Sequence, residues 1–238
     1  MNPEILYEDE NIVAINKPAG LVVHSDGKTS EPTLTDWVFS KYPKTKDVGE
    51  PIITSSGKII ERAGIVHRLD RETSGVMLVA KTKEGFECLK KQFQNHEIKK
   101  VYEAFVFGEM KDDKGVIDRP IGRSKSDFRR WSAQRGARGE MREAITEYEV
   151  LKRADGYSFV KVMPKTGRTH QIRVHFKAIN YPLVADSLYA PDRENNLGFK
   201  RLALHSKQVT FKDVFGNERM VEAPYSEDFQ FAKSKMLC

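Results

Sequence analysis

Ile65–Ala80 reads IVHRLDRETSGVMLVA, a compact polar segment that leads directly into an apolar run. An apolar run that follows a glycine and is rich in Val, Met and Leu is typical of a buried strand. The polar residues are therefore expected at the mouth of a core strand. Asp70 is the only Asp among them, and Arg68 and Arg71 flank it. Because neighbouring cations favour the anionic form of a carboxyl group, Asp70 suits a nucleophile or an electrostatic stabiliser better than a proton donor.

The composition of the chain limits its class. The 238 residues, 39% of them hydrophobic, suffice for one sizeable core or two fused halves. The net charge of +6 suits a polyanionic partner such as nucleic acid. Two cysteines allow at most one disulfide and form no metal-type pair. Without a signal-peptide pattern or an apolar run of membrane-spanning length, we expect a reducing, cytoplasmic location and no membrane partner.

Apolar and alternating runs predict the strands. A short interruption at Asp9–Asn11 separates two such runs and predicts a hairpin. A long apolar run after Lys99 predicts a strand that is buried on both faces. The predicted strands, besides the one that ends at Ala80, are Ile5–Glu8, Ile12–Lys17, Lys99–Phe107, Ala144–Lys152, Tyr157–Met163 and Arg201–Phe211, with a partner strand after the turn at Phe215–Asn217.

Threonines before helical patterns predict three N-caps. The expected caps are Thr33, Thr82 and Thr169, for helices over Leu34 to about Tyr42, Lys83 to about Asn95, and from Thr169 to about Ile179. Two other stretches are less regular. Lys44–Arg62 is predicted to be a hairpin-like excursion or a loop, and Ala223–Pro224 is expected to close the domain.

Three blocks of the sequence resemble one known family. His67–Gly75, HRLDRETSG, is similar to the signature of pseudouridine synthases of the RluA family, with Asp70 at the position of the catalytic aspartate. The tyrosine in Lys100-x-Tyr102-x-Ala104 aligns with the one that faces that aspartate. In Pro164–His175, Arg173 aligns with the arginine that pairs with the catalytic Asp, and Ile172 with an apolar pocket residue.

The resemblance covers Ile5 to about Phe229 and implies the fold. That fold is α+β, with a mixed, mainly antiparallel sheet in two fused halves, flanked by helices and carrying RNA-gripping loops. It implies a single catalytic domain over residues 1–238, with no N-terminal RNA-binding domain. It also implies no cofactor, and the chain has no Gly-rich phosphate loop, dinucleotide fingerprint or convincing metal set.

A basic segment lies between Asp118 and Arg142, where eight basic residues stand against three acidic ones. Cations bind phosphates and ring faces stack on bases, so the segment suits RNA as well as a solvated charged loop. In the RluA family, the corresponding insertion resembles a finger that grips RNA, which favours RNA contact. The candidate RNA-binding residues are Arg123, Arg129, Arg130, Trp131, Arg135 and Arg138, together with Phe128 and, before the third motif helix, Arg168.

The resemblance implies that the chain converts uridine in RNA to pseudouridine. Asp70 attacks ribose C1′ or removes the 2′ proton, and the sequence leaves both routes open. Arg173 keeps Asp70 ionised and oriented, and Tyr102 borders the base as a candidate acceptor of the C5 proton. The pocket residues are Ile172, Arg68 and Leu69.

Other functions remain open at this point. An RNA N-glycosidase also uses a carboxylate and an arginine but releases free uracil, and a catalytically inactive RNA-binding protein on the same fold fits the charge. A protein kinase does not fit, because the kinase Asp-Phe-Gly and Gly-rich loop are missing. The expected partner is a stem-loop of ribosomal or transfer RNA, with no obligate protein partner.

Overall fold

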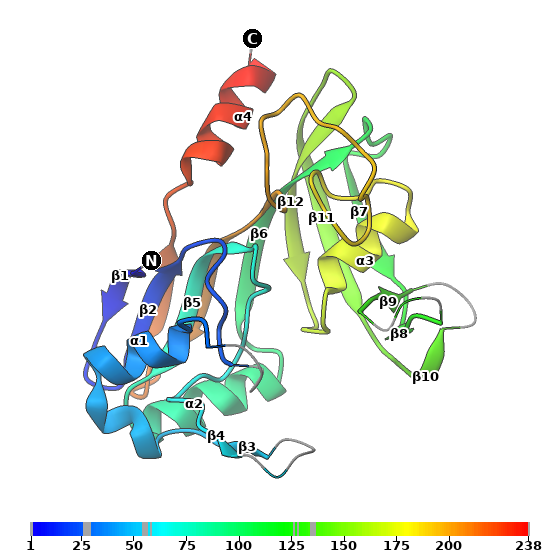
Figure 1. Cartoon of the computed structure of the whole chain (residues 1–238). Helices are drawn as coiled ribbons and strands as arrows, with labels where there is room; N and C mark the ends of the chain where they lie inside the picture. Colours follow the sequence, from blue (N-terminus) through cyan, green and yellow to red (C-terminus); the bar gives the residue numbers. More distant parts are fainter. Residues whose placement is uncertain are drawn as a thin grey trace. The chain divides into compact units, whose positions relative to one another are not determined.

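The computed structural model describes residues 2–25, 30–53, 57, 59–125, 127, 129–133 and 137–237 (Figure 1). The chain forms two compact units. Unit 1 comprises Met1–Lys99 and Ser206–Pro224, and unit 2 comprises Lys100–His205 and Tyr225–Cys238. Each unit therefore combines an early part of the chain with a later one.

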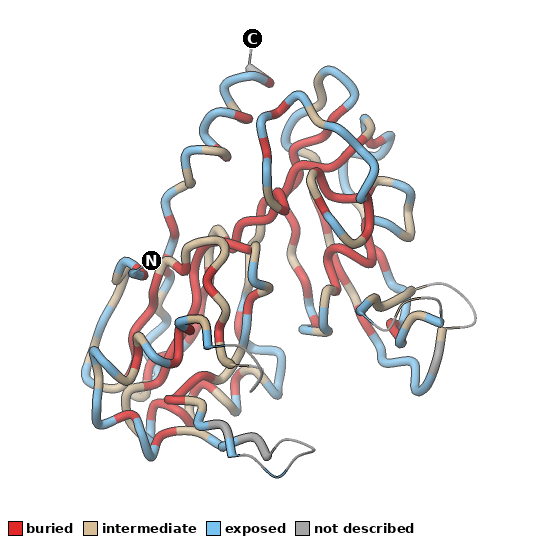
Figure 2. The backbone as a smooth tube through the Cα atoms, viewed as in Figure 1, coloured by how far each residue is buried: buried red, intermediate tan, exposed pale blue. Residues whose placement is uncertain are grey.

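Unit 1 contains sheet strands in the order β1-β2-β5-β13, with β14 paired to β13, and the β1–β2, β2–β5 and β13–β14 pairs are antiparallel. Every residue of β5 is buried, which confirms the predicted core strand (Figure 2). Gly75 has φ +110°, and a Cβ there would lie 2.2 Å from the carbonyl oxygen of Ser206, so only glycine fits at this strand contact. The strands are β1 (Glu4–Glu8), β2 (Ile12–Lys17), β5 (Ser74–Ala80), β13 (Leu204–Lys212) and β14 (Glu218–Glu222).

Two helices of unit 1 begin at the predicted threonines. The side chain of Thr33 caps α1 (Leu34–Lys41) and forms a capping box with Asp36. The hydroxyl of Thr82 accepts a hydrogen bond from the backbone N–H of Gly85 at the start of α2 (Lys83–Gln94). Phe86 and Leu89 of α2 pack into the cluster formed with β2 and β5. The predicted excursion contains η1 (Pro43–Asp47) and a hairpin of β3 (Ile52–Ile53) and β4 (Ile59–Ile60).

Unit 2 contains antiparallel strands of the nine-stranded sheet in the order β6-β12-β11-β7. Ile172 and Phe176 of α3 (Gln171–Ala178) pack onto this sheet in one apolar cluster. The strands are β6 (Lys99–Phe107), β7 (Lys114–Asp118), β11 (Ile145–Ala154) and β12 (Tyr157–Pro164). The prediction of an α+β fold with mainly antiparallel strands is confirmed.

The prediction that Thr169 caps α3 is wrong. The N-cap is His170, which has φ +54°, and no side chain caps the helix. The start of α3 depends instead on Gln171, whose side-chain oxygen accepts hydrogen bonds from the Thr166 hydroxyl at 2.7 Å and the Arg168 N–H at 2.9 Å. Its amide group donates to the Ile145 carbonyl at 3.0 Å, so contacts with β11 locate the first turn.

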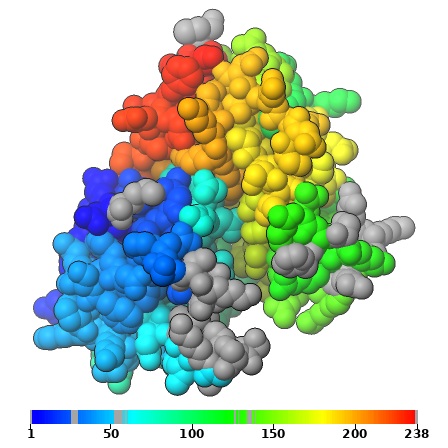
Figure 3. Space-filling view, in the orientation of Figure 1, coloured from blue at the N-terminus to red at the C-terminus, as the bar shows by residue number. Residues whose placement is uncertain are grey.

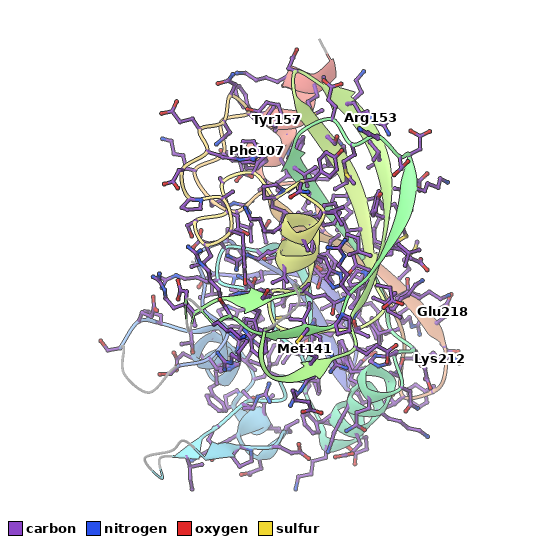
Figure 4. The ribbon with its side chains drawn as sticks, turned by 90° about the vertical axis from the view of Figure 1, so that its right-hand side faces the viewer. Phe107, Met141, Arg153, Tyr157, Lys212 and Glu218 are labelled. Atoms are coloured by element: carbon purple, nitrogen blue, oxygen red, sulfur yellow. The ribbon has the colours of Figure 1, made fainter. Side chains whose placement is uncertain are left out.

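The expectation that Ala223–Pro224 closes the domain is also wrong, because α4 (Glu227–Leu237) follows. Phe229 and Ala232 of α4 are fully buried in an apolar cluster of unit 2 that includes Phe107 and Tyr157. The rings of Phe107 and Tyr157 lie 5.7 Å apart (Figure 4). The helix also contacts the segment that precedes β13, where Lys235 donates to the Asn196 carbonyl at 2.7 Å (Figure 3).

The basic segment forms a small three-stranded sheet in unit 2, in the order β10-β8-β9. Its strands are β8 (Ile121–Arg123), β9 (Trp131–Ser132) and β10 (Arg138–Arg142). Met141 on β10 is 40% exposed (Figure 4). The candidate RNA-binding residues Phe128 and Arg135, and the side chain of Arg138, lie outside the part of the chain that is described.

Candidate active site

Asp70 begins a tight turn that leads the chain into β5. Its carbonyl oxygen accepts a hydrogen bond from the backbone N–H of Thr73 at 3.1 Å. Leu69 is buried, Asp70 is half-buried, and Arg68 is exposed, so the turn presents the carboxylate between an apolar anchor and the surface. Thr73 and every residue of β5 are buried, which makes the strand behind Asp70 a firm support.

Lys17, at the end of β2, is a fully buried residue that holds this turn in place. Its ammonium group donates hydrogen bonds to the carbonyls of Pro18 at 2.9 Å, Leu21 at 2.9 Å and Arg71 at 3.0 Å. The N–H of Gly20 also donates to the Arg71 carbonyl at 2.8 Å. An ammonium group has three donors, and three carbonyls satisfy them. Lys17 therefore ties the Pro18–Leu21 loop to the Asp70 turn.

His67 of the signature motif supports β5 rather than carrying chemistry. Its Nε2 accepts a hydrogen bond from the backbone N–H of Leu78 at 2.9 Å, so that nitrogen carries no proton. The ring stacks on Phe93 of α2 with 4.5 Å between centroids. The histidine is thereby held as the neutral ring between a strand and a helix.

Arg71 turns to the surface of unit 1. Its guanidinium group forms a two-point contact with Glu31, at 2.8 and 3.2 Å. Because more than half of the Arg71 side chain is exposed, this ion pair adds little stability. Arg68, on the other side of Asp70 in the sequence, is exposed as well.

Arg173 lies on α3 in unit 2 and is buried, with 8% of its side chain exposed. Its Nε and Nη2 atoms each lie 2.8 Å from a carboxylate oxygen of Asp186, whose side chain is fully buried. Asp186 also accepts the backbone N–H groups of Leu188 and Tyr189. The guanidinium carbon lies 5.2 Å from the centre of the Tyr189 ring. These contacts fix the position of the Arg173 guanidinium.

Asp186 is a residue of the candidate site that the sequence interpretation missed. The signal available was an acidic residue in Tyr181–Tyr189, a loop otherwise rich in apolar and aromatic residues. Thirteen positions separate Asp186 from Arg173, too far for a helix-spacing rule to connect them.

Tyr102 and Ile172 belong to the same apolar cluster of unit 2. Tyr102 lies on β6, opposite Val162 of β12, and is half-buried. Ile172 is 6% exposed and precedes Arg173 on α3. Tyr102, Ile172 and Arg173 are thus gathered in unit 2, whereas Asp70 lies in unit 1. The pairing of Asp70 with Arg173 stays a prediction.

Two candidate arginines of the basic segment are bound by an acidic neighbour. Asp127 accepts hydrogen bonds from the Arg129 side chain at 2.9 and 3.1 Å, and its carboxylate lies 3.3 Å from Arg130 Nε. Hydrogen bonds from Arg129, together with the charges of Arg129 and Arg130, lower the pKa of Asp127 to about 2. These contacts hold the two guanidinium groups beside Asp127.

Trp131 contributes both to this segment and to the core of unit 2. The guanidinium of Arg123 lies 4.4 Å from the centre of its ring, a cation–π contact. Its backbone N–H donates to the Tyr189 hydroxyl at 3.0 Å, and its ring packs beside Ile121 and Val174. The half-buried Trp131 therefore anchors the small sheet beside the loop that holds Arg173.

Arg168 has a structural role within unit 2. Its Nε donates to the carbonyl of Glu143 at 2.9 Å, and its backbone N–H donates to Gln171. His175 is likewise buried between the Thr146 hydroxyl and the Arg119 carbonyl, each at 2.9 Å. Within the described ranges, no group of three His, Cys, Asp or Glu residues is arranged to hold a metal ion. No helix in the same ranges is long and apolar enough to cross a membrane.

Comparison with known proteins identifies the family. Residues 11–178 match the family described as RNA pseudouridylate synthase. An uncharacterized RNA pseudouridine synthase of Synechocystis is 36% identical over 207 residues, 87% of this chain and 60% of that protein. The solved structure of human RNA pseudouridylate synthase domain containing 4 covers 98% of this chain and 92% of that one, with 24% identity and a TM-score of 0.75, and confirms the fold.

The family match spans more than half of the chain, so this chain belongs to the RNA pseudouridylate synthase family. A relative with a more specific name aligns with nearly the whole of this chain. Ribosomal large subunit pseudouridine synthase D of Pseudomonas aeruginosa is 37% identical over 238 aligned residues, which cover 95% of this chain and 69% of that protein. The chain spans 60% of the Synechocystis relative.

Proposed function

We propose that this protein isomerises specific uridines in structured RNA to pseudouridine, with Asp70 as the catalytic carboxylate. The observation that carries the proposal is the position of Asp70, on a turn fastened by the buried Lys17 at the mouth of a wholly buried strand. A carboxylate on such a support keeps its orientation while a substrate binds. Membership of the family supports the reaction class.

The reaction breaks the bond between uracil N1 and ribose C1′, turns the base, and joins C5 to C1′. The product has the atoms and electrons of the substrate, so the reaction consumes no co-substrate. Asp70 either attacks C1′ or removes the 2′ proton, and in both cases the carboxylate must be ionised at the start. The base must leave its stack first, at a cost of about a few kcal/mol that contacts in the pocket offset.

Unit 2 supplies the other groups in this proposal. Arg173, fixed by Asp186, is the cation that orients Asp70 in the complex with RNA. Tyr102 borders the uracil and is the candidate acceptor of the C5 proton. Ile172 contributes apolar surface that excludes water and strengthens the interaction between the two charges.

The proposed substrate is a stem-loop of ribosomal or transfer RNA. Ribosomal RNA is the first choice, because the Pseudomonas relative is named for the large ribosomal subunit. The exposed cations of the basic segment, Arg123 and Arg129 among them, are proposed to contact the RNA backbone, and Trp131 to stack at its edge. The proposed place of action is the cytoplasm.

Pseudouridine mapping tests the proposal. Total RNA is compared from cells with the gene, cells without it, and cells that carry Asp70→Asn. We expect one or a few pseudouridines to disappear in both altered strains and to return when the wild-type gene is restored. Identical maps in all three strains would contradict the proposed function, and release of free uracil from the RNA would identify an N-glycosidase instead.

A further inference from the structure

Three basic side chains of unit 1 interact near the Asp70 turn. They are His24, Arg62 and Arg68, and we call them the His24 cluster. The charges of Arg68 and Arg62 both disfavour a proton on His24, and the charge of Arg68 also acts on Arg62, so the two arginines repel each other. Burial, followed by these two charges, lowers the pKa of His24 to about 4, and the ring is neutral near pH 7.

Two buried polar atoms of the cluster have no hydrogen-bond partner. They are Nδ1 of His24 and Nε of Arg62, both shielded from solvent. Buried polar groups in folded proteins are nearly always hydrogen-bonded, and an orphaned one calls for a partner that the free chain does not supply. Nε of Arg62 is a donor, so it needs a hydrogen-bond acceptor. Nδ1 of His24 needs an acceptor as well when the ring is protonated.

The nearby carboxylates are already engaged. Glu50 acts on Arg62, but Glu50 is exposed and forms a short ion pair with Lys90. Glu31 is bound to both terminal nitrogens of Arg71. Glu50 and Glu31 are therefore not reserved for the His24 cluster, whose two guanidinium charges favour an anion from outside the chain.

We propose that His24, Arg62 and Arg68 form a binding site for a backbone phosphate of the RNA, beside the catalytic carboxylate. Two guanidinium groups match the oxygens of a phosphate, and an imidazolium adds a third positive donor. Arg68 precedes Asp70 by two residues, so the phosphate belongs to the target nucleotide or its immediate neighbour. The proposal rests on the proposed function for the identity of the anion as RNA.

The support beneath the site agrees with this role. Lys17 binds the carbonyl of Leu21, three residues before His24, and also binds that of Arg71 in the Asp70 turn. One buried ammonium thus positions both the segment that carries His24 and the turn that carries Asp70. A phosphate bound by the His24 cluster would hold its nucleotide beside the Asp70 carboxylate.

Phosphate binding is linked to proton uptake by His24. Arg68 and Arg62 disfavour the imidazolium in the free protein, and a bound phosphate offsets their charge. The pKa of His24 therefore rises when the site fills. The pKa of His24 is higher in the phosphate complex than in the free protein. Phosphate therefore binds more tightly as the pH falls through the interval between these two pKa values.

Histidine NMR with inorganic phosphate as the probe tests the site directly. The ring signals of His24 are followed against pH, with phosphate and with chloride at equal ionic strength. We expect phosphate to raise the pKa of His24 in the wild type and in Lys91→Gln, a control at an exposed position of α2. Arg62→Gln should abolish the rise, and Arg62→Lys should restore part of it. An equal His24 pKa in phosphate and chloride, or an undiminished rise in Arg62→Gln, would overturn the proposal.

RNA binding provides the second arm. A transcript of large-subunit ribosomal RNA is bound to the wild type, His24→Gln, Arg62→Gln and Lys91→Gln over a series of salt concentrations. Loss of one phosphate contact should reduce the salt slope by about one in the site variants and leave the control unchanged. Slopes equal to that of the wild type in both site variants would overturn the proposal.

The two arms separate this site from the proposed function. If the wild type makes no pseudouridine but His24 responds to phosphate, the proposed function fails and the anion site stands. If pseudouridine forms and His24 does not respond, the phosphate site fails alone. Circular dichroism on each variant establishes that it is folded before binding is compared.

Discussion

The ion pair of Arg173 with Asp186 and those of Asp127 with Arg129 and Arg130 join the same kinds of charged groups but differ in burial. The Arg173 side chain is 8% exposed and that of Asp186 is fully buried, whereas 61% of the Arg129 side chain is exposed. A buried ion pair with both oxygens and both nitrogens engaged fixes geometry, and losing one partner leaves a buried charge. An exposed pair is weak and exchanges readily with another anion. The buried pair therefore suits the positioning of a reacting group, and the exposed pairs suit a surface that binds RNA.

Removing the anion from the buried pair should have the largest effect. Asp186→Asn leaves the Arg173 guanidinium buried without its counter-charge, which costs about 3–5 kcal/mol of folding free energy. We expect a lower denaturant midpoint for unit 2 and loss of pseudouridine formation at temperatures where the variant is still folded. Urea unfolding monitored by near-UV circular dichroism measures the change.

Asp112→Asn is the matched control for that variant, because Asp112 is exposed in the same unit. It should unfold like the wild type and keep its activity. If Asp186→Asn were as stable as the wild type, the Arg173–Asp186 ion pair would not stabilise unit 2.

Lys17 extends the comparison to unit 1, where a buried cation is held by carbonyls rather than by a carboxylate. Lys17→Met keeps much of the side-chain volume but orphans acceptors of the Pro18–Leu21 loop and the Asp70 turn, at about 1–3 kcal/mol for a buried unsatisfied group. We expect reduced stability and a fall in kcat. Amide hydrogen exchange at Thr73, whose N–H bonds to Asp70, should speed up, and unchanged protection there would contradict the role given to Lys17.

Neutralising the exposed Arg129 and the half-buried Arg130 should affect RNA binding much more than the fold. Arg129→Gln combined with Arg130→Gln should leave the thermal midpoint unchanged and reduce the salt slope of RNA binding by up to about two. Filter binding over a salt series checks the prediction, with Lys114→Gln on the exposed part of β7 as the control. A slope equal to that of the wild type would remove these arginines from the RNA-binding surface.

The smallest expected effect concerns pH. The pKa of Asp127 is about 2 in the folded protein, below the ordinary value of 3.8, because of Arg129 and Arg130. The ionised carboxylate therefore favours the folded state above pH 3.8, and this contribution disappears as the pH falls through about 2. Carboxyl NMR should show Asp127 titrating near pH 2 in the wild type. In the double Arg129→Gln, Arg130→Gln variant the pKa of Asp127 should rise but stay below its ordinary value, because the backbone N–H at position 129 still donates to the carboxylate. An unchanged pKa would show that the arginine side chains do not cause the shift.

Local sequence signals predicted the parts of the fold that depend on local interactions. Thr33 and Thr82 cap helices through N–H groups three residues away, and the apolar run after Gly75 forms most of the buried β5. Thr169 failed as a cap because His170 adopts a left-handed conformation and Gln171 bonds to β11, a contact between distant segments.

The candidate site shows the same division between local and distant signals. The motif around Asp70 was recognised from contiguous residues, and Arg173 from its block. Lys17 and Asp186 were missed because the atoms they bind lie in other segments, and a lysine that binds backbone carbonyls leaves no pattern in the side chains it contacts. Asp127 was counted only as one of the three acidic residues of the basic segment. Its contacts with Arg129 and Arg130 were not predicted.

Tritium release measures whether Asp70 carries out uridine isomerisation. RNA transcribed with 5-tritiated uridine is incubated with wild-type protein, Asp70→Asn and Asp47→Asn, the last being an exposed position of unit 1. The wild type and Asp47→Asn should release tritium as the C5 proton is lost, and Asp70→Asn should release none while it still binds the RNA. Release from Asp70→Asn at the wild-type rate would contradict the assignment of Asp70 as the catalytic residue.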